Sequence, residues 1–341
     1  MNDGYRSVAL TDDDLRVRFP EHDYDGYWMF GGIRGDGPWQ ALLVGLSLGV
    51  NDGYDWGFID VKPDTNFCLY ALNLIGREEC AGYLEQPIHR HRFRYDRRRL
   101  DIRLDDRLHV TGEWPRISYY VASADRSLIV ELEGHMSIAH WSPDMILRGT
   151  SWVTVAIPDL HFQGQVTVHG ERHEISGIGT LDHPMGRLFQ SPTSPGMGHW
   201  EYNCMMLNER YGLYQWNIVD GNGEILASEA VTDFPDGRYH VGRLQLEYLD
   251  YEDRGPVHVP RAWRCRIEAD HGTFEHVVRA VGQPWDGTPH RVGAPLPNFL
   301  LLLEGEFTGI GGSRVQVRGK GTGETVISER DPRTGRRQKP W

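Results

Sequence analysis

An internal repeat constrains the fold of this chain more than any other feature of its sequence. The segment Phe162–Asp182 (FQGQV…GIGTLD) is matched by the segment Leu303–Glu324 (LEGEF…GKGTGE). The offset between the two copies changes by only one residue along the match, which a hairpin loop absorbs. Both copies read as strand, turn and strand, and both close on G-x-G-T-x followed by an acidic residue. Such self-similarity predicts a duplicated structural unit.

A second match supports duplication, because it recurs in the same order. An aromatic pattern occurs at Trp28, Phe30 and Trp39 and again at Trp200, Tyr202 and Tyr211. Its larger offset predicts about 30 extra residues between the opening and closing strands of the first copy, expected in Asn51–Ile102.

The local patterns predict an antiparallel all-β protein. Alternation of apolar and polar residues predicts strands at 128–133, 152–157, 165–169, 244–248, 263–267 and 315–317. The 40 glycines and 19 prolines favour many turns. Thr11 with Asp12–Asp14 predicts a short helix, and Leu72–Leu84 has weak helical periodicity, but no segment sustains four helical turns. Each copy is expected to be a meandering sheet that curls into a barrel and so removes its edges. The predicted organisation is an arm (1–20), a first domain (21–187), a linker (188–198), a second domain (199–329) and a tail (330–341).

Charge and missing motifs exclude several classes of function. A net charge of −12 argues against nucleic-acid binding, which needs a concentrated cationic surface. No apolar run approaches 18 residues and the start lacks a signal-peptide pattern, so a cytoplasmic protein without stable membrane insertion is expected. The four cysteines lack CxxC spacing, and His89-x-His91 has no third ligand nearby, so no metal site is expected. Phosphate-loop, dinucleotide, nucleophile-elbow and HExxH motifs are absent, and no cofactor is expected.

The two copies differ at their ends, where the first carries Asp182-His183 and the second has no histidine. Duplication alone does not require this pair, and it lies at the predicted junction of the domains, where ligand sites are common. A buried carboxylate beside an imidazole can hold a proton with a tuned pKa, which suits general acid–base catalysis. The alternative is that Asp182 caps a turn and His183 is a core residue.

The strand after the linker combines acidic, basic and aromatic groups. Alternation places His199, Glu201 and Asn203 on one face and Trp200, Tyr202 and Cys204 on the other. Either face could line a pocket, in which aromatic rings would stabilise a carbocation, or the rings could belong to a core. The remaining candidate substrate-binding residues are Trp28, Tyr54, Asp55, Trp56, Met185, Tyr214, Trp216 and Asn217.

At Gly177–Gly186 (GIGTLDHPMG) the sequence resembles the G-x-G-Y-x-D-H-x-W-G segment of the carotenoid 1,2-hydratase superfamily, also described as AttH-like. The closing segment Leu303–Glu324 is similar to that family's E-G…G-x-G-Y-x-E segment, and the order agrees from about Tyr24 to Ile327. The resemblance implies two lipocalin-like antiparallel β-barrels in tandem with few short helices. It also implies an apolar pocket between them and catalysis without a cofactor. Fungal Diels–Alderases share this fold, and tocopherol cyclase is a more distant relative.

Carried over by position, Asp182 and His183 match the family's D-H pair. Met185 stands where the family has tryptophan and Thr180 where it has tyrosine. The acidic position of the hydratases falls near Asn217, so Glu201 or Asp182 would have to supply the proton.

The sequence therefore predicts a cofactor-independent hydratase, isomerase or cyclase acting on a large apolar isoprenoid or polyketide. Asp182 and His183 would transfer the proton and Glu201 would assist. A Diels–Alderase-type pericyclase and a non-catalytic lipid or polyene carrier are the alternatives. The expected partner is the hydrophobic substrate. Transient association with a membrane is compatible with the sequence, and the chain is expected to be a monomer or a homodimer.

Overall fold

The structure is a computed structural model that describes residues 6–8, 11–19, 24–51, 65–89, 92–136, 139–147, 150–186, 197–220, 225–254, 257–285 and 298–326. Within these residues the chain is almost entirely β-strand, and its one helix is α1 (Asp12–Leu15). Thr11 caps this helix, as predicted, through a capping box with Asp14. The described residues include no helix that is long and apolar enough to cross a membrane.

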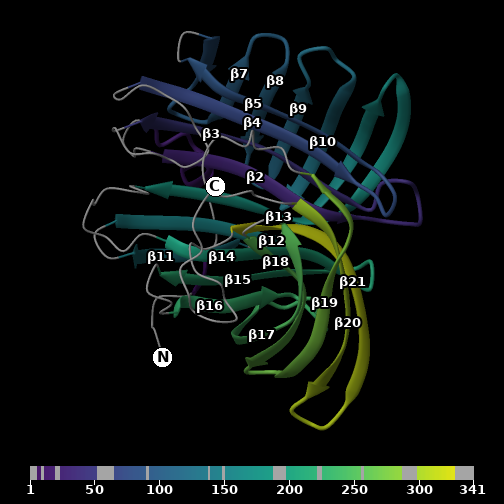
Figure 1. Cartoon of the computed structure of the whole chain (residues 1–341). Helices are drawn as coiled ribbons and strands as arrows, with labels where there is room; N and C mark the ends of the chain where they lie inside the picture. Colours follow the sequence, from purple (N-terminus) through teal and green to yellow (C-terminus); the bar gives the residue numbers. More distant parts are fainter. Residues whose placement is uncertain are drawn as a thin grey trace.

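The N-terminal part forms one antiparallel sheet of 13 strands. Its main path runs β5-β4-β3-β2-β13-β12-β10-β9-β8-β7-β6, with β1 and β11 attached at β12. Its strands are β1 (Arg6–Val8), β2 (Tyr24–Ile33), β3 (Ala41–Asn51), β4 (Thr65–Ile75), β5 (Cys80–His89), β6 (Phe93–Tyr95), β7 (Leu100–Leu104), β8 (Leu108–Glu113), β9 (Arg116–Ala122), β10 (Leu128–Met136), β11 (Ala139–Leu147), β12 (Thr150–Val168) and β13 (Glu171–Gly186). This curled sheet encloses its own hydrophobic core (Figure 1).

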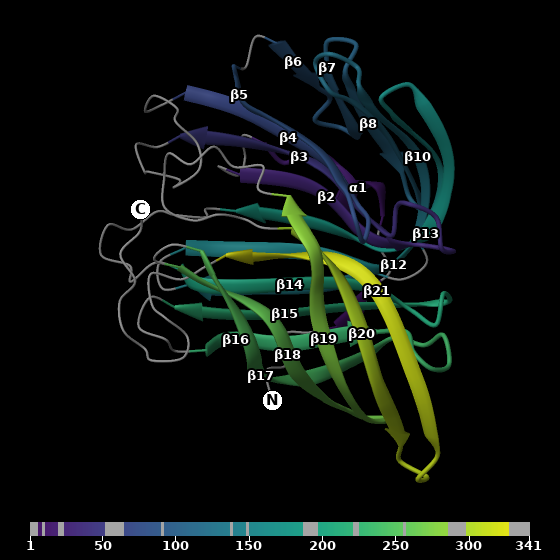
Figure 2. The same ribbon diagram turned by 45° about the vertical axis from the view of Figure 1, so that its right-hand side comes forward.

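The C-terminal part is a closed barrel of consecutive antiparallel strands with a second, separate core. Its strands are β14 (Met197–Leu207), β15 (Tyr211–Asp220), β16 (Ile225–Thr232), β17 (His240–Arg254), β18 (Val257–Ala269), β19 (Gly272–Trp285), β20 (Asn298–Gly309) and β21 (Arg314–Val326). Figures 1 and 2 both show β12 and β13 between β3–β5 and this barrel. The predicted fold class is confirmed. The predicted linker lies mostly outside the described residues, as do part of the predicted arm and all of the predicted tail.

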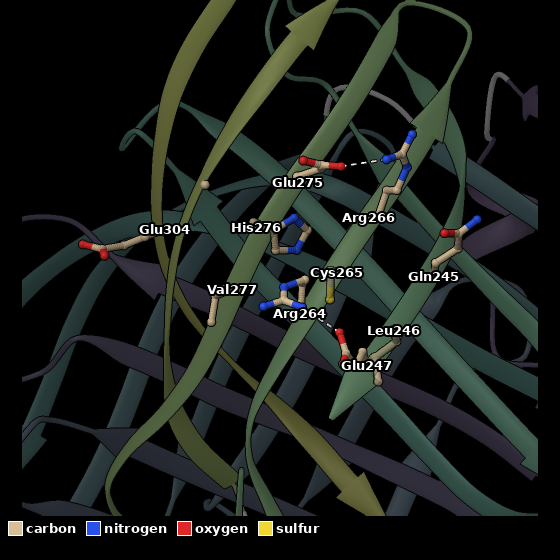
Figure 3. Close-up of a pocket in the computed structure, with 11 residues that line it drawn as sticks. Gln245, Leu246, Glu247, Arg264, Cys265, Arg266, Glu275, His276, Val277 and Glu304 are labelled. Carbon is tan, nitrogen blue, oxygen red and sulfur yellow. Dashed lines mark hydrogen bonds and ion pairs between the residues drawn. The ribbon is translucent and has the colours of Figure 1, made fainter. Parts of the chain in front are cut away.

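The outer wall of the closed barrel is charged, as alternation predicts for strands with one face in water. Across β17–β19, Arg264 pairs with Glu247 at 2.8 Å and Arg266 with Glu275 at 2.7 Å (Figure 3). All four side chains are exposed, so each pair adds little to stability.

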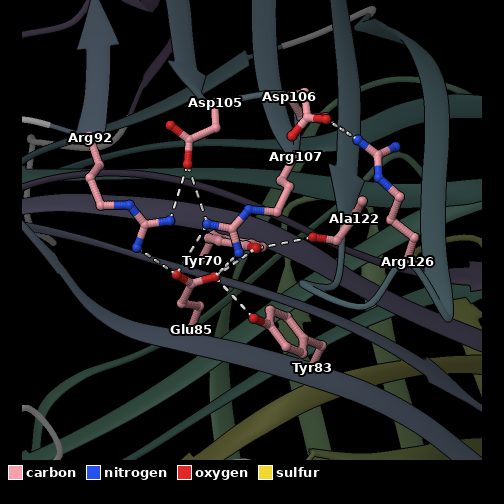
Figure 4. A network of polar contacts seen from close by, with 9 residues as sticks. All are labelled: Tyr70, Tyr83, Glu85, Arg92, Asp105, Asp106, Arg107, Ala122 and Arg126. Atoms are coloured by element: carbon pink, nitrogen blue, oxygen red, sulfur yellow. Dashed lines mark hydrogen bonds and ion pairs between the residues drawn. The ribbon is translucent and has the colours of Figure 1, made fainter.

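Side chains, rather than backbone hydrogen bonds, link the two ends of the N-terminal sheet. Glu85 on β5 accepts hydrogen bonds from Arg92 at 3.1 Å and Arg107 at 2.5 Å, which flank β6 and β7 at the far end of the path (Figure 4). Tyr70 on β4 donates to the carbonyl of Ala122, after β9, at 3.0 Å. Burial opposes ionisation of Glu85, but its bonds to Arg107 and Tyr83 outweigh burial and lower its pKa. The network therefore curls the open sheet towards a barrel.

The repeat segments form equivalent hairpins in the two sheets. β12 and β13 form the first hairpin and β20 and β21 the second, and each second strand pairs with the opening strand of its own sheet, β2 or β14. A Cβ at Gly179 would lie 2.2 Å from the carbonyl oxygen of Phe30, and one at Gly321 would lie 2.0 Å from that of Cys204. The G-x-G motif therefore permits the same close strand approach in both copies.

The strand register corrects the aromatic alignment by two residues. Trp28 lies opposite Asp182, but Glu324, the counterpart of Asp182 in the repeat, lies opposite Tyr202 rather than Trp200. A shift of two residues leaves every side chain on its original face, but only the match of Trp28 with Tyr202 remains aromatic, because Phe30 then corresponds to Cys204.

The two sheets pack face to face, with β2 and β13 against β14, β15 and β21. A Cβ at Gly32 would lie only 2.4 Å from the carbonyl oxygen of Lys320, so the backbones meet there. Asn73 of β4 donates to Asn298 of β20 at 3.1 Å, and Lys320 donates to Gln40 at 3.1 Å. These buried contacts fix the arrangement of the residues at the interface.

Candidate functional site

Alternation along β13 separates two sets of side chains. Leu181 and Met185 belong to the N-terminal core, and His183 stacks on Tyr27 of that core at 4.2 Å between ring centroids. Asp182, one residue away, points to the opposite face and towards the C-terminal barrel. The cross-strand partner Trp28 shares that face, since directly opposed residues point the same way.

Asp182 is a buried acid at the interface between the two sheets. It is 6% exposed, and among the described residues its Oδ1 atom has no hydrogen-bond partner. Burial, and then the nearby charge of Glu324, raise the pKa of Asp182 well above its ordinary value. The raised pKa favours the protonated form of the carboxyl group, which can donate a proton.

Glu324 brings a second carboxyl group to the same interface. Burial raises its pKa to about 7, although the side chain keeps some exposure. In the repeat this residue is the counterpart of Asp182, so packing of the two copies brings their matched acids together. Sequence reasoning did not name Glu324 as a site residue, but the shared G-x-G-T-x-acid ending was the signal that could have found it.

Aromatic side chains of the closed barrel lie beside the two acids. Tyr202 lies opposite both Glu324 and Trp216 in the sheet, so these three side chains share the face turned to the N-terminal sheet. Tyr214 stacks on Tyr202 with ring centroids 6.0 Å apart and contacts Trp216 at 4.8 Å. Burial, and then the charge of Asp182, raise the pKa of Tyr214 well above its ordinary value. Its phenol therefore stays protonated.

On the N-terminal side, Trp28 donates its indole N–H to Ser47 Oγ at 2.9 Å. The structure therefore brings together four of the predicted binding residues, Trp28, Tyr202, Tyr214 and Trp216, beside Asp182.

The predicted pairing of Asp182 with His183 is wrong. His183 Nε2 instead lies 2.7 Å from Asp25 Oδ1, and both side chains are fully buried in the N-terminal core. Asp25 also accepts the backbone N–H groups of Arg18 and Phe19 at 2.5 and 3.1 Å. Consecutive strand residues face opposite ways, so His183 helps to hold the N-terminal segment while Asp182 faces the second barrel. Met185 likewise packs in the core.

Glu201, the predicted assisting acid, is also separated from Asp182. It is 1% exposed and lies opposite Asn217, on the face of β14 that points into the closed barrel. Burial, and then the charge of Glu201 and a hydrogen bond to it, raise the pKa of Tyr248 well above its ordinary value. Asn203 lies on the same inner face, opposite Gln215. The predicted division of β14 into two faces is confirmed, but the faces line different spaces.

The remaining candidates are not placed beside the acids. His199 and Trp200 lie on β14, but their side chains are outside the description. Tyr54, Asp55 and Trp56 lie outside the described residues altogether.

Two grooves elsewhere on the described surface have several charged side chains in their walls. One of about 480 Å³ crosses the charged wall of β17–β20, and one of about 790 Å³ lies across β8–β13 beside Arg34, Glu131 and Arg172. Their charged walls do not suit an apolar ligand. Among the described residues, one group could hold a metal ion at an end of the closed barrel. It consists of His240, Asp270 and His271.

Comparisons with known proteins find similarity at the level of structure. No protein-family model and no curated protein sequence matches this chain. A protein described as an AttH from Nitrosomonas europaea has a TM-score of 0.62 and 14% identity, over 94% of this chain and 97% of that one. Kievitone hydratase from Nectria haematococca has a TM-score of 0.59 and 12% identity, over 94% and 93%. CghA with Sch210972 has a TM-score of 0.52 and 12% identity, over 95% and 98%. This chain thus has the fold of the AttH-like proteins, as the motif at Gly177–Gly186 predicted.

Proposed function

We propose that this protein is a cofactor-independent hydratase, isomerase or cyclase that acts on a large apolar isoprenoid or polyketide between the two sheets. The observation that carries the proposal is the buried carboxyl group of Asp182, whose Oδ1 atom has no hydrogen-bond partner among the described residues, beside Glu324 and an aromatic wall. The structures with the same fold include a hydratase and the Diels–Alderase CghA, which supports chemistry on small organic substrates.

The proposed reaction begins with proton transfer from Asp182 to one carbon of an alkene. The π bond breaks, a C–H bond forms and the other carbon becomes a carbocation. The faces of Tyr214 and Trp216 stabilise this charge by cation–π attraction in a site shielded from water.

The fate of the cation defines the product. Attack by water, with Glu324 accepting the water proton, gives an alcohol. Attack by a second alkene gives a ring, and loss of a neighbouring proton gives an isomer. In each case a proton returns to the enzyme and no cofactor is consumed.

The test uses the full chain with a panel of prenylated and polyene substrates in D₂O. Wild type is expected to place solvent deuterium on a product carbon, and Asp182→Asn is expected to lower kcat/KM by about 10²- to 10⁴-fold. Asp233→Asn is the matched control, because Asp233 is also buried with a pKa of about 7 but lies outside the aromatic wall. Unchanged turnover by Asp182→Asn would overturn the proposal.

A pericyclase is the second candidate, favoured by the stacked wall of Tyr202, Tyr214 and Trp216. In that case positioning lowers most of the barrier. Trp216→Leu would then reduce turnover strongly, whereas Asp182→Asn would reduce it little and no solvent deuterium would enter the product. A carrier would return every bound ligand chemically unchanged.

A further inference from the structure

Two histidines and an aspartate meet at one end of the closed barrel. His240 is the first residue of β17, and Asp270 and His271 form the two-residue turn between β18 and β19. The pairing of Gly242 with Ala269 brings this turn beside the start of β17. The ligand atoms of the three side chains all lie within 4.8 Å of one another.

The outer nitrogen of each imidazole has a partner that orients the ring. His271 Nε2 lies 3.0 Å from the carbonyl oxygen of Phe234, so it carries the proton and donates it. His240 Nε2 lies 3.0 Å from Asp236 Oδ1. Metal-binding histidines characteristically donate their second N–H to a carbonyl or carboxylate in this way, which leaves the other nitrogen for the ion.

The inner nitrogens of both histidines face the same carboxylate oxygen. Asp270 Oδ1 lies 3.1 Å from His240 Nδ1 and 3.4 Å from His271 Nδ1. Ligand atoms held about 2.1 Å from a tetrahedral zinc ion are about 3.4 Å from one another. The two separations that involve Asp270 Oδ1 are therefore close to those between ligands on one ion, and the three ligand atoms all lie within 4.8 Å of one another.

Packing restricts the two rings. They stack with centroids 3.4 Å apart and an interplanar angle of 17°, and His271 also stacks on Phe307 at 5.0 Å. Because the ring planes are nearly parallel, binding of one ion by both Nδ1 atoms requires a small rotation of each ring about its Cβ–Cγ bond. Asp270, whose side chain is 82% exposed, can follow that movement.

We propose that His240, Asp270 and His271 bind a divalent transition-metal ion of the Zn²⁺ type. Two imidazoles and one carboxylate supply three ligands, and the exposed side of the site leaves the fourth to water. The ion would join β17 to the β18–β19 turn and stabilise the barrel. This inference stands independently of the proposed function, because the three ligands lie at the start of β17 and in the β18–β19 turn, and not on the faces of β13, β14, β15 and β21 that carry the acids and the aromatic wall.

The test measures metal binding by the full chain after dialysis against a chelator. Titration with ZnCl₂ in a calorimeter is expected to show one ion per chain, and Zn²⁺ is expected to raise Tm. CoCl₂ is expected to give the visible absorption of a tetrahedral Co²⁺ complex. Asp270→Asn, a change in an exposed turn, and His271→Gln are each expected to weaken Zn²⁺ binding by at least about 10- to 100-fold.

His161→Gln is the matched control. His161 also pairs with an aspartate, Asp159, at 2.7 Å, but it does not belong to a group of three possible metal ligands among the described residues. It should bind Zn²⁺ as wild type does. The proposal is overturned if wild type binds no ion, or if His240→Gln/His271→Gln binds Zn²⁺ as tightly as wild type. Either result would mean that the three residues serve only to hold the imidazole of His240 between Asp236 and Asp270 by hydrogen bonds.

Discussion

Asp182 and His183 are neighbours in the chain but belong to different environments. His183 lies with Asp25 in the N-terminal core, where both are fully buried, whereas Asp182 faces the second barrel and its Oδ1 atom has no hydrogen-bond partner in the part of the chain that the structure describes. The pair of Asp25 and His183 stabilises the fold, and Asp182 is the proposed proton donor. At the scale of single residues, stability and proposed chemistry can therefore be tested separately.

Removing Asp25 is expected to destabilise the fold. Asp25→Ala leaves His183 and the N–H groups of Arg18 and Phe19 without their buried acceptor. Loss of one partner of a buried pair typically costs about 3 to 5 kcal/mol. Urea unfolding should show this loss, with Asp25→Asn, which keeps an acceptor oxygen, less affected. Equal stability of Asp25→Ala and wild type would contradict the assigned role.

Glu324 is expected to make the fold less stable as pH rises. Its folded pKa of about 7 exceeds the ordinary 4.5, so its contribution is fully present below the ordinary value and is lost as pH rises through about 7. Between about pH 5 and about pH 8, titration of Glu324 should lower the unfolding free energy of wild type by at most about 3 kcal/mol. Glu324→Gln should lack this part of the decrease. Urea titrations at both pH values measure this, and identical pH dependence in both proteins would refute it.

The same variant should shift the activity profile. Burial is the main cause of the raised pKa of Asp182, and the charge of Glu324 adds to it. Removing that charge lowers the pKa of Asp182, so the alkaline limb of kcat/KM should move to lower pH in Glu324→Gln.

At the scale of strands, β2 sets how closely the two sheets approach. Gly32 leaves no room for a side chain against the backbone of Lys320. Gly32→Ala is therefore expected to push the sheets apart, at a cost of about 1 to 3 kcal/mol, and to lower turnover because Asp182 and Glu324 would separate. Gly37→Ala is the control, since a Cβ there meets nothing within 4 Å. Thermal unfolding and turnover of both variants check this, and equal values for the two would contradict it.

The strands were predictable from the sequence, whereas the contacts between them were not. Alternation predicted the two faces of β14 correctly. The same rule, applied to Asp182 and His183, would have separated them. The partner of His183 could not be predicted, because Asp25 lies on another strand and no local pattern encodes their pairing. His240 and His271 similarly meet only through the register of the closed barrel.

At the scale of the whole molecule, the duplication explains both the architecture and the candidate site. The repeat predicted two barrel-like sheets, and the matched acids of the two copies, Asp182 and Glu324, meet where the sheets pack. How two sheets dock depends on the shape of both faces, including close approaches such as that at Gly32. For this reason the repeat could identify the acids but not place them together.

The proposed chemistry depends most directly on a neutral, protonated Asp182 at the interface. Infrared spectroscopy of the full chain at neutral pH measures this without a substrate, because a protonated carboxyl group has its own carbonyl stretching band. We expect the band of protonated Asp182 in wild type. It should disappear in Asp182→Asn and persist in the control Asp233→Asn. Identical carboxyl bands in wild type and Asp182→Asn would show that Asp182 is ionised and would contradict its role as the proton donor.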